Sequence, residues 1–280
     1  MVLKGQAALV RLARRQLPPA AADRWVSLLR PGFLLREADD GEPVVGQLGG
    51  VPVLPDGLAW PQRDGYGPLT FVAEIDCGQL PSDSLAMPRS GTLSFFVHSD
   101  LPVAREEPEN LAAARVVYTP AGTPVTERDP PAGAGSHDLV ELTGGLHATG
   151  PAWDSPVFRE AIADLADERA YLDDWKHGDS LRQAAWEAEL QVPHRIGGHA
   201  SPVQEAVELD VARARLGVAV AYDDPAVHRE ALRWTLLAQF GSEHRAGMMW
   251  GDCGTLYWLI RPADLAARNF EAASFTWQCT

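Results

Sequence analysis

A carboxylate and a thiol lie between two glycines in the segment Trp250-Gly251-Asp252-Cys253-Gly254, directly before a run of strand-forming residues. Glycine permits turns in which backbone N–H groups face a ligand, so Asp252 and Trp250 are our first candidates for ligand binding. The alternative is that Asp252 bonds its own backbone while Trp250 fills the core. Cys253 would be a nucleophile only beside a base, and the available histidines are remote or lie in loops. We therefore interpret Cys253 as a small buried residue and assign no catalytic residue.

Polar residues also surround a second pair of glycines, Gly197-Gly198. His194 and His199 flank this pair at a spacing that cannot share one helical face, and no carboxylate stands at ligand spacing, so we predict no metal site. We interpret the segment as a loop in which Arg195 pairs with an acid and the glycines permit positive φ or close approach of a strand. Gln204, just beyond, is a candidate for bonding a ligand or a strand edge.

Tryptophans lie in or next to these motifs, and their rings in a cleft would favour sugars, peptides or flat ligands, although aromatic residues more often pack in the core. They are Trp60, Trp234, Trp250 and Trp258. The common enzyme signatures GxxxxGK, GxGxxG after a strand, GxSxG, HExxH and CxxC do not occur in the sequence. We therefore assign no cofactor.

Short segments of strand-forming residues must position these side chains. In the first half, Leu69–Asp76, Gly91–Val97 and Arg115–Tyr118 have the composition of strands. Residues 121–150 are dense in glycine and proline, which predicts long loops. Ser155 followed by Pro156 is typical of a helix start, and apolar residues continue at helical spacing to Trp175. A further helix is expected over residues 181–190.

The second half repeats the order of the first. Leu48-Gly49-Gly50 precedes the segments 69–75 and 91–97, and Ile196-Gly197-Gly198 precedes the segments 234–240 and 254–260. This order predicts an α+β fold, mainly antiparallel β-sheets built from two divergent half-repeats of about residues 44–120 and 192–280, with packed helices and a helical and loop insert over 121–191. Chance recurrence of short motifs is the alternative. If the repeat is real, Glu74 and Gln239 occupy equivalent positions, and pockets form where such units meet.

Residues 1–40 form a separate basic segment before a single domain over 41–280. Seven Lys or Arg side chains stand against one acid in residues 1–36, whereas 37 acidic and 17 basic side chains follow. Apolar spacing predicts an amphipathic helix broken at Pro18-Pro19 and a second helix from Asp23 to Leu29. One interpretation is an arm that docks on an anionic partner, and the other, which we favour, is a helical hairpin packed on its own acidic domain.

Several ordered motifs together resemble the YwqG-like family, domain of unknown function 1963. They are the segments 48–61 (LGGVPVLPDGLAWP), 69–76 (LTFVAEID), 194–198 (HRIGG), 202–204 (PVQ), 249–260 (MWGDCGTLYWLI) and 264–270 (DLAARNF). The resemblance runs from about Gly46 to Cys279 and implies a soluble bacterial α+β protein with internal duplication, without an activity that can be transferred. The segment His199-Ala200-Ser201 departs from the aromatic, proline and acid that the family more often has there.

Composition limits the function classes. The chain has 280 residues, a net charge of −14 and 46% hydrophobic residues, which favours a folded acidic protein and disfavours binding to nucleic acid or anionic membranes. Three cysteines without a CxxC pair and no long apolar run indicate a cytoplasmic protein. Two hypotheses follow. The chain is a protein-binding module, such as an immunity-type partner of a basic toxin, or it is a small-ligand binder or enzyme with a site between the half-repeats, lined by Asp252, Arg195, Gln204, Glu74 and His194.

Overall fold

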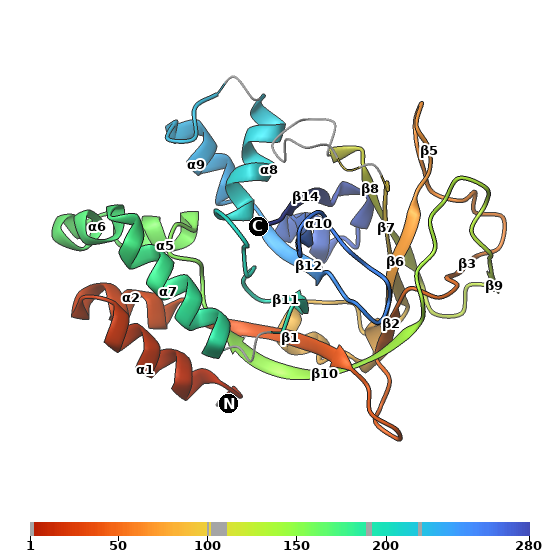
Figure 1. Cartoon of the computed structure of the whole chain (residues 1–280), viewed down its shortest axis with the longest axis horizontal. Coiled ribbons are helices and arrows are strands. Elements are labelled where there is room, and N and C mark those ends of the chain that lie inside the picture. The colour runs from red at the N-terminus through yellow and green to blue at the C-terminus, as the bar shows by residue number, and fades with distance from the viewer. Residues whose placement is uncertain (1–2, 100, 102–110, 189–191, 218–219) are drawn as a thin grey trace.

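The computed structural model describes residues 3–99, 101, 111–188, 192–217 and 220–280. One antiparallel sheet of ten strands dominates it. In spatial order the strands are β14 (Ser274–Gln278), β13 (Thr255–Ile260), β12 (Thr235–Gly241), β11 (His194–Gly197), β1 (Arg30–Glu37), β10 (Val140–Thr149), β2 (Gly46–Leu48), β6 (Thr70–Asp76), β7 (Thr92–Val97) and β8 (Ala114–Thr119). The sheet curves strongly, so that its two ends share one apolar core (Figure 1).

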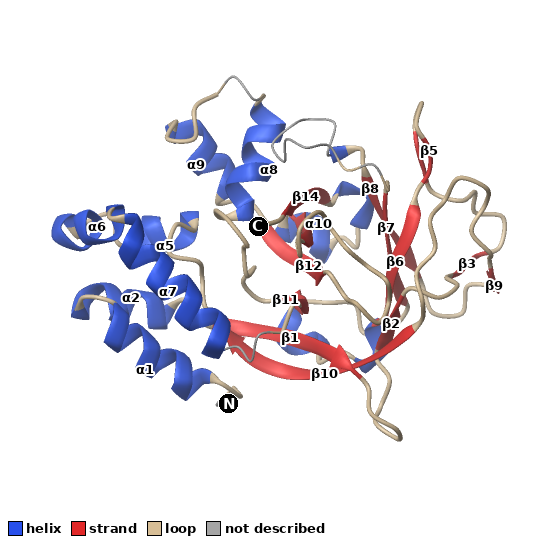
Figure 2. Cartoon of the chain, viewed as in Figure 1, coloured by secondary structure: helices blue, strands red, loops and turns tan. Residues whose placement is uncertain are grey.

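Helices and short strands complete the α+β fold, as Figure 2 shows. The helices are α1 (Gln6–Gln16), α2 (Pro19–Ser27), α3 (Ser82–Leu85), α5 (Pro156–Ala161), α6 (Ala166–Asp173), α7 (Trp175–Ala188), α8 (Val207–Leu216), α9 (Pro225–Ala231) and α10 (Pro262–Ala266), with 3-10 turns η1 (Cys77–Gln79) and η2 (Phe270–Ala272). The short strands are β3 (Val53–Pro55), β4 (Gln62–Arg63), β5 (Gly67–Pro68) and β9 (Val125–Glu127). Among the described residues, no helix has the length and hydrophobicity that crossing a bilayer requires.

The two ends of the sheet correspond strand by strand. Strands β2, β6, β7 and β8 follow the central pair β1–β10 on one side, and β11, β12, β13 and β14 follow it on the other. The β6–β7 pairing shifts register between Phe71 and Ala73, and the β12–β13 pairing shifts between Leu236 and Ala238. A β-bulge therefore occurs at the same position of both ladders, two residues after the leading threonine of each strand.

Glycines of the two halves also correspond, both in backbone conformation and in close approach to a neighbouring strand. Gly49-Gly50 and Gly197-Gly198 both have positive φ at each residue, between 56° and 72°, which a side chain would strain. A Cβ atom on Gly91 would lie 2.5 Å from the carbonyl oxygen of Thr119, and one on Gly254 would lie 2.4 Å from that of Gln278. Strand order, register and turn conformation thus agree between the two halves, and their common ancestry stays a prediction.

The predicted strands over 69–76, 91–97 and 115–118 are confirmed as β6, β7 and β8. The prediction of long loops over 121–150 holds for residues 121–139 apart from the short β9, and is wrong for residues 140–149, where β10 contributes ten residues to the centre of the sheet. Its Gly144 explains the misleading turn signal: a Cβ at this position would lie 2.3 Å from the Leu34 carbonyl oxygen of β1. Glycine is needed for close pairing at this position, and not for a turn.

A helical bundle covers one end of the β1–β10 pair. Helices α1, α2, α5, α6 and α7 enclose their own apolar core, in which Leu9, Trp25 and Phe158 are fully buried. The second N-terminal helix begins at Pro19 rather than at Asp23, because proline suits the first turn of a helix. Ser155 caps α5 as predicted, with its Oγ accepting from Phe158 N, but the apolar run that follows divides into α5, α6 and α7.

Asp154 joins this bundle to α8 and gives the first testable prediction. Its Oδ2 accepts from Ala206 N at 2.8 Å, whereas its Oδ1 is buried without a hydrogen bond to any described residue. Burial raises the pKa of Asp154 from 3.8 to about 6. The folded state therefore binds this proton more tightly than the unfolded chain, so the stabilisation from this proton is fully present below about pH 4 and is lost as pH rises through 6.

We expect Asp154→Asn to gain stability relative to the natural chain as pH rises from 4 to 8, by up to about 3 kcal/mol. Asparagine keeps an acceptor for Ala206 N and never ionises. Urea unfolding of both proteins across this range checks the prediction. A difference in the free energy of unfolding that stays constant with pH would contradict it.

Candidate functional site

The loop over residues 242–254 joins β12 to β13 and holds the predicted candidate turn. Its base is closed by two backbone hydrogen bonds of 2.9 Å between Glu243 and Met248. Ser242 Oγ donates to the Gly254 carbonyl at 3.0 Å and accepts from Trp250 N at 2.9 Å. These contacts fold the loop back on itself, and its tip is packed against the protein, where Ala246 is buried in the main core and its carbonyl accepts from Asp138 N at 3.0 Å.

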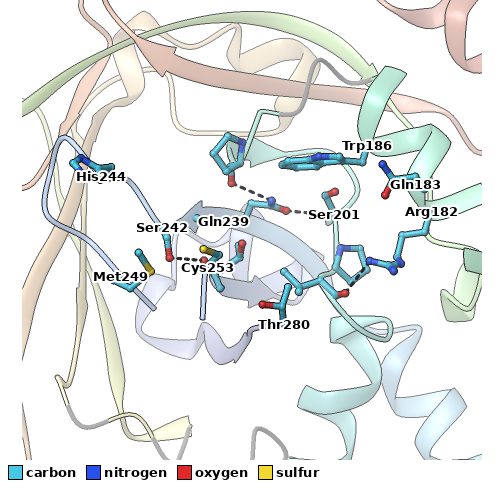
Figure 3. A pocket seen from close by; sticks show the side chains of 16 residues that line it. Arg182, Gln183, Trp186, Ser201, Gln239, Ser242, His244, Met249, Cys253 and Thr280 are labelled. Atoms are coloured by element: carbon cyan, nitrogen blue, oxygen red, sulfur yellow. Dashed lines mark hydrogen bonds between the residues drawn. The ribbon is translucent and has the colours of Figure 1, made fainter. Parts of the chain in front are cut away.

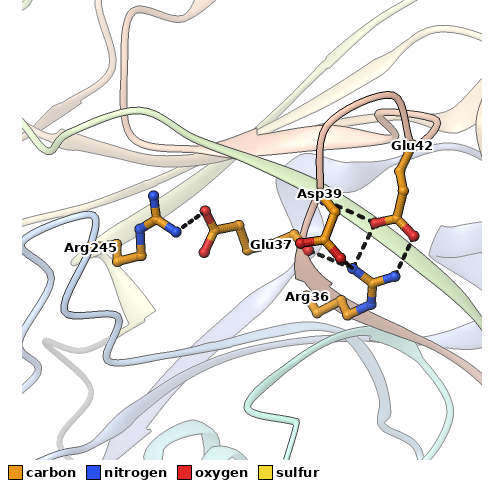
Figure 4. A network of polar contacts seen from close by, with 5 residues as sticks. All are labelled: Arg36, Glu37, Asp39, Glu42 and Arg245. Carbon is orange, nitrogen blue, oxygen red and sulfur yellow. Dashed lines mark hydrogen bonds and ion pairs between the residues drawn. The ribbon is translucent and has the colours of Figure 1, made fainter.

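Two polar side-chain contacts fasten this loop to the rest of the sheet. Glu243 Oε2 lies 3.6 Å from His194 Nε2, and Arg245 pairs with Glu37 at the end of β1 (Figure 4). His194 is buried and its Nδ1 accepts from Gly241 N, so its Nε2 is the nitrogen that can donate to Glu243. The contact with His194, supported by the Arg245 backbone N–H, lowers the pKa of Glu243 to about 2 against the opposing effect of burial.

A cavity of about 580 Å³, the α7 cavity, opens on one side of the loop (Figure 3). Helix α7 forms one wall and the segment 201–203 another, while the end of β12 and the loop close the remaining sides. The lining residues are Arg182, Gln183, Trp186, Pro193, Ser201, Pro202, Val203, Gln239, Gly241, Ser242, His244, Met249, Cys253, Gly254, Thr255 and Thr280. Its apolar side chains are those of Trp186, Met249, Val203 and the two prolines.

A second cavity of about 530 Å³, the tryptophan cavity, lies on the other side of the same loop. It is lined by Thr70, Ser99, Leu101, Gly135, His137, Met249, Trp250, Gly251 and Trp277. His137 meets the ring of Trp250 edge to face with centroids 5.4 Å apart, and burial lowers the pKa of this histidine. Met249 belongs to both cavities and is 58% exposed.

Gln239 forms the floor of the α7 cavity and is held by both ends of its amide. Its Oε1 accepts from Ser201 N at 2.9 Å, and its Nε2 donates to the Pro193 carbonyl at 3.1 Å. Glu74 makes the equivalent contact in the first half, where its Oε2 accepts from Val53 N at 3.3 Å. Each side chain thus anchors the backbone four residues after the first glycine of its Gly-Gly turn.

This correspondence yields a matched pair of variants. Gln239→Glu places a second acceptor against the Pro193 carbonyl, and we expect it to lower the free energy of unfolding by about 1–3 kcal/mol. Glu74→Gln keeps its acceptor and removes a carboxylate whose pKa burial raises, so a change within about 1 kcal/mol is expected. Chemical denaturation at neutral pH compares the two. An equal loss of unfolding free energy in both variants would contradict the prediction that Gln239 needs its amide donor while Glu74 needs only an acceptor.

The predicted candidate turn contributes to the cavities only in part. Trp250 lines the tryptophan cavity but is only 6% exposed. Asp252 is exposed and lines neither cavity, and its backbone carbonyl accepts from the N–H and hydroxyl of Thr280. Cys253 is exposed at φ 51°, so its prediction as a buried residue is wrong. The left-handed conformation turns it out of the packed sheet.

The remaining predicted residues lie apart from both cavities. His194 and Arg195 are buried in β11, and Arg195 Nη1 donates to the His199 carbonyl at 3.1 Å. Gln204 is exposed and its backbone N–H donates to Gln278 Oε1 at 2.9 Å. Trp60 donates through Nε1 to the Leu69 carbonyl at 2.8 Å. The set Asp252, Arg195, Gln204, Glu74 and His194 therefore does not converge on one pocket.

A family model described as a domain of unknown function (DUF1963) matches residues 46–279. The chain belongs to the DUF1963 family. A search of curated proteins gives no match to it. The DUF1963 match includes the β12–β13 loop and all residues that line the two cavities except Thr280, whereas α1, α2 and β1 precede it.

The lining of the two cavities in this DUF1963 chain is largely apolar. Cys253 and His244 both line the α7 cavity, but no hydrogen bond joins them within the described part of the chain. In the same described ranges, no three His, Cys, Asp or Glu side chains gather to hold a metal ion. What the cavities offer is apolar surface with hydroxyl and amide groups at its edge, which suits binding.

Sequence reasoning does not identify Trp186, Met249 or Gln239 as lining residues. The signal for Trp186 is its spacing of four from Arg182, which puts both residues on one face of a helix that is expected to be half solvated. Met249 directly precedes the candidate turn, and Gln239 stands out only as the equivalent of Glu74. Nothing in the sequence places α7 opposite the β12–β13 loop, because more than fifty residues separate these segments.

Proposed function

We propose that the chain is a protein-binding module that takes up an extended, basic segment of a partner across the β12–β13 loop. One observation carries the proposal: the α7 cavity and the tryptophan cavity open on either side of a single exposed side chain, Met249. A partner segment that crosses Met249 can insert one large apolar side chain into each cavity. Paired anchor pockets of this kind are typical of peptide recognition.

The residues at the crossing point suit such contacts. Met249 is unbranched and polarisable, so it adapts to the shape of a bound chain. Trp186 offers a flat apolar face, and Arg182 beside it is held by the Val203 carbonyl at 3.0 Å and by Asp179 at 2.5 Å. The wall on the α7 side is therefore ordered before a partner arrives, which lowers the entropic cost of binding.

Charge favours a basic partner. The 37 acidic side chains after Arg36 exceed the 17 basic ones, so the body that bears the cavities attracts cationic segments and repels acidic ones. A basic toxin in an immunity-type pairing is one case of such a partner. Because this attraction is electrostatic, the association should weaken as salt rises.

Selection from a displayed library of random linear peptides on the immobilised full chain tests the proposal. We expect enriched peptides to carry two large apolar residues separated by a short spacer, with Lys or Arg nearby. Failure to enrich any sequence, or enrichment of acidic peptides, would overturn it.

The alternative function is the binding of a small molecule within the α7 cavity alone. Its volume of about 580 Å³ lies within the range usual for small-molecule sites. A metabolite panel monitored by thermal unfolding distinguishes the two, since a ligand at about 100 times its Kd stabilises by about 2.7 kcal/mol. A stabilising compound that does not compete with the selected peptides would favour this alternative.

A further inference from the structure

The outward side of α1 carries a cluster of positive charge. Arg11, Arg14 and Arg15 follow one another at spacings of three and one, which places them on one side of the helix, and Lys4 lies just before its start. All four are exposed, and no ion pair involves them among the described residues. We call these four residues the basic face.

The opposite side of α1 explains why the basic face points outward. Leu9, Leu12 and Ala13 are buried in the core of the bundle, against α2, α7 and their neighbours. The helix therefore packs through its apolar side, and its arginines do not neutralise the acidic body of their own chain. The favoured interpretation of a packed hairpin accounts for the apolar side of α1 and leaves the basic face unexplained.

The same bundle carries a matching negative surface around α6. Five acidic side chains lie within eleven residues there: Asp164, Asp167, Glu168, Asp173 and Asp174. Asp164 and Asp173 remain 66% and 64% exposed although they pair with Arg24 and Arg159. Helices α1 and α6 lie at the same end of the molecule, remote from the β12–β13 loop (Figure 1). We call the five residues the acidic face.

We propose that two copies of the chain associate through this bundle, with the basic face of each copy against the acidic face of the other. Because each copy carries a basic and an acidic face at the same end of the molecule, a twofold axis can set each basic face against the acidic face of the other copy. Each contact is then made twice, so weak exposed ion pairs act together. The contact leaves both cavities open and does not depend on the proposed peptide-binding function.

Sedimentation equilibrium of the full chain tests the dimer. We expect self-association at about 50 mM salt that weakens about tenfold or more at about 500 mM salt, because exposed charges are screened. Arg11→Glu with Arg14→Glu and Arg15→Glu should abolish it, as should Asp167→Lys with Glu168→Lys. These positions are exposed, or partly exposed at Glu168, and circular dichroism with thermal unfolding verifies that each variant folds.

Mixing the two charge-reversed variants is the decisive arm. Each should be monomeric alone, and an equimolar mixture should recover association, because the reversed faces complement one another across the interface. A chain that stays monomeric at every concentration and salt would overturn the proposal. So would a dimer that both variants leave intact, or a monomeric chain whose basic face instead binds a polyanion such as heparin.

Discussion

Replacing Trp258 with alanine is expected to lower the free energy of unfolding by about 3–5 kcal/mol. Its indole is 1% exposed and lies between aromatic rings from both halves of the sheet, with centroids 5.2 Å from Phe95, 5.8 Å from Phe240 and 5.1 Å from Phe275. Phe95 and Trp258 follow the bulge in equivalent ladders, opposite Ala73 and Ala238. Truncating this contact opens a cavity where the two halves meet.

Guanidinium chloride unfolding of the full chain measures the effect. Leu232→Ala is the control, because this leucine is 43% exposed and a change within about 0.5 kcal/mol is expected there. A loss below about 1.5 kcal/mol for Trp258→Ala would mean that the two halves do not depend on this shared core.

Replacing Met249 with aspartate is expected to weaken the binding of a selected basic peptide about 100-fold, which corresponds to about 2.7 kcal/mol. The substitution removes the apolar wall common to both cavities and puts a charge where the peptide must bury apolar surface. Met249 is exposed, so the fold should tolerate the change. Fluorescence anisotropy with a labelled peptide gives both Kd values.

Leu216→Asp is the matched control for Met249→Asp. Leu216 is 43% exposed at the end of α8 and lines neither cavity, and its replacement adds the same charge. The Kd of this control should change less than about threefold. Equal weakening by the two substitutions would show that charge alone governs the interaction, and that the position of Met249 between the cavities is irrelevant.

Local patterns in the sequence predict strands within each half of the sheet better than the central pair β1–β10. Strands β6 and β7 follow from alternation and from strand-forming composition, whereas β12 follows only from the repeated order of motifs. Strand β10 contains Gly144-Gly145, and β1 begins at Arg30, beside the Pro31-Gly32 pair that is typical of a helix end, so both resemble turns. Their conformation is decided by pairing with each other over more than one hundred residues, which no local pattern records.

For the candidate site, the sequence predicts the location better than it predicts the side chains that line it. The glycines of the turn over 250–254 predict a site there, and the turn does lie between the two cavities. The polar side chains chosen as ligands are less informative, because Asp252 faces solvent while His194 and Arg195 are buried in β11. Cavity walls arise where distant segments meet, so Trp186 becomes a site residue only when the packing of α7 is known.

The exposed thiol of Cys253 allows the peptide-binding account to be tested at the cavity itself. Cys253 lines the α7 cavity, Cys77 is buried, and Cys279→Ser removes the remaining partly exposed thiol. The measurement is the rate of Cys253 alkylation by iodoacetamide, followed by mass spectrometry with and without a saturating selected peptide. Peptide lying across the β12–β13 loop should slow alkylation about tenfold or more. An unchanged rate at saturation would place the peptide elsewhere and contradict the account.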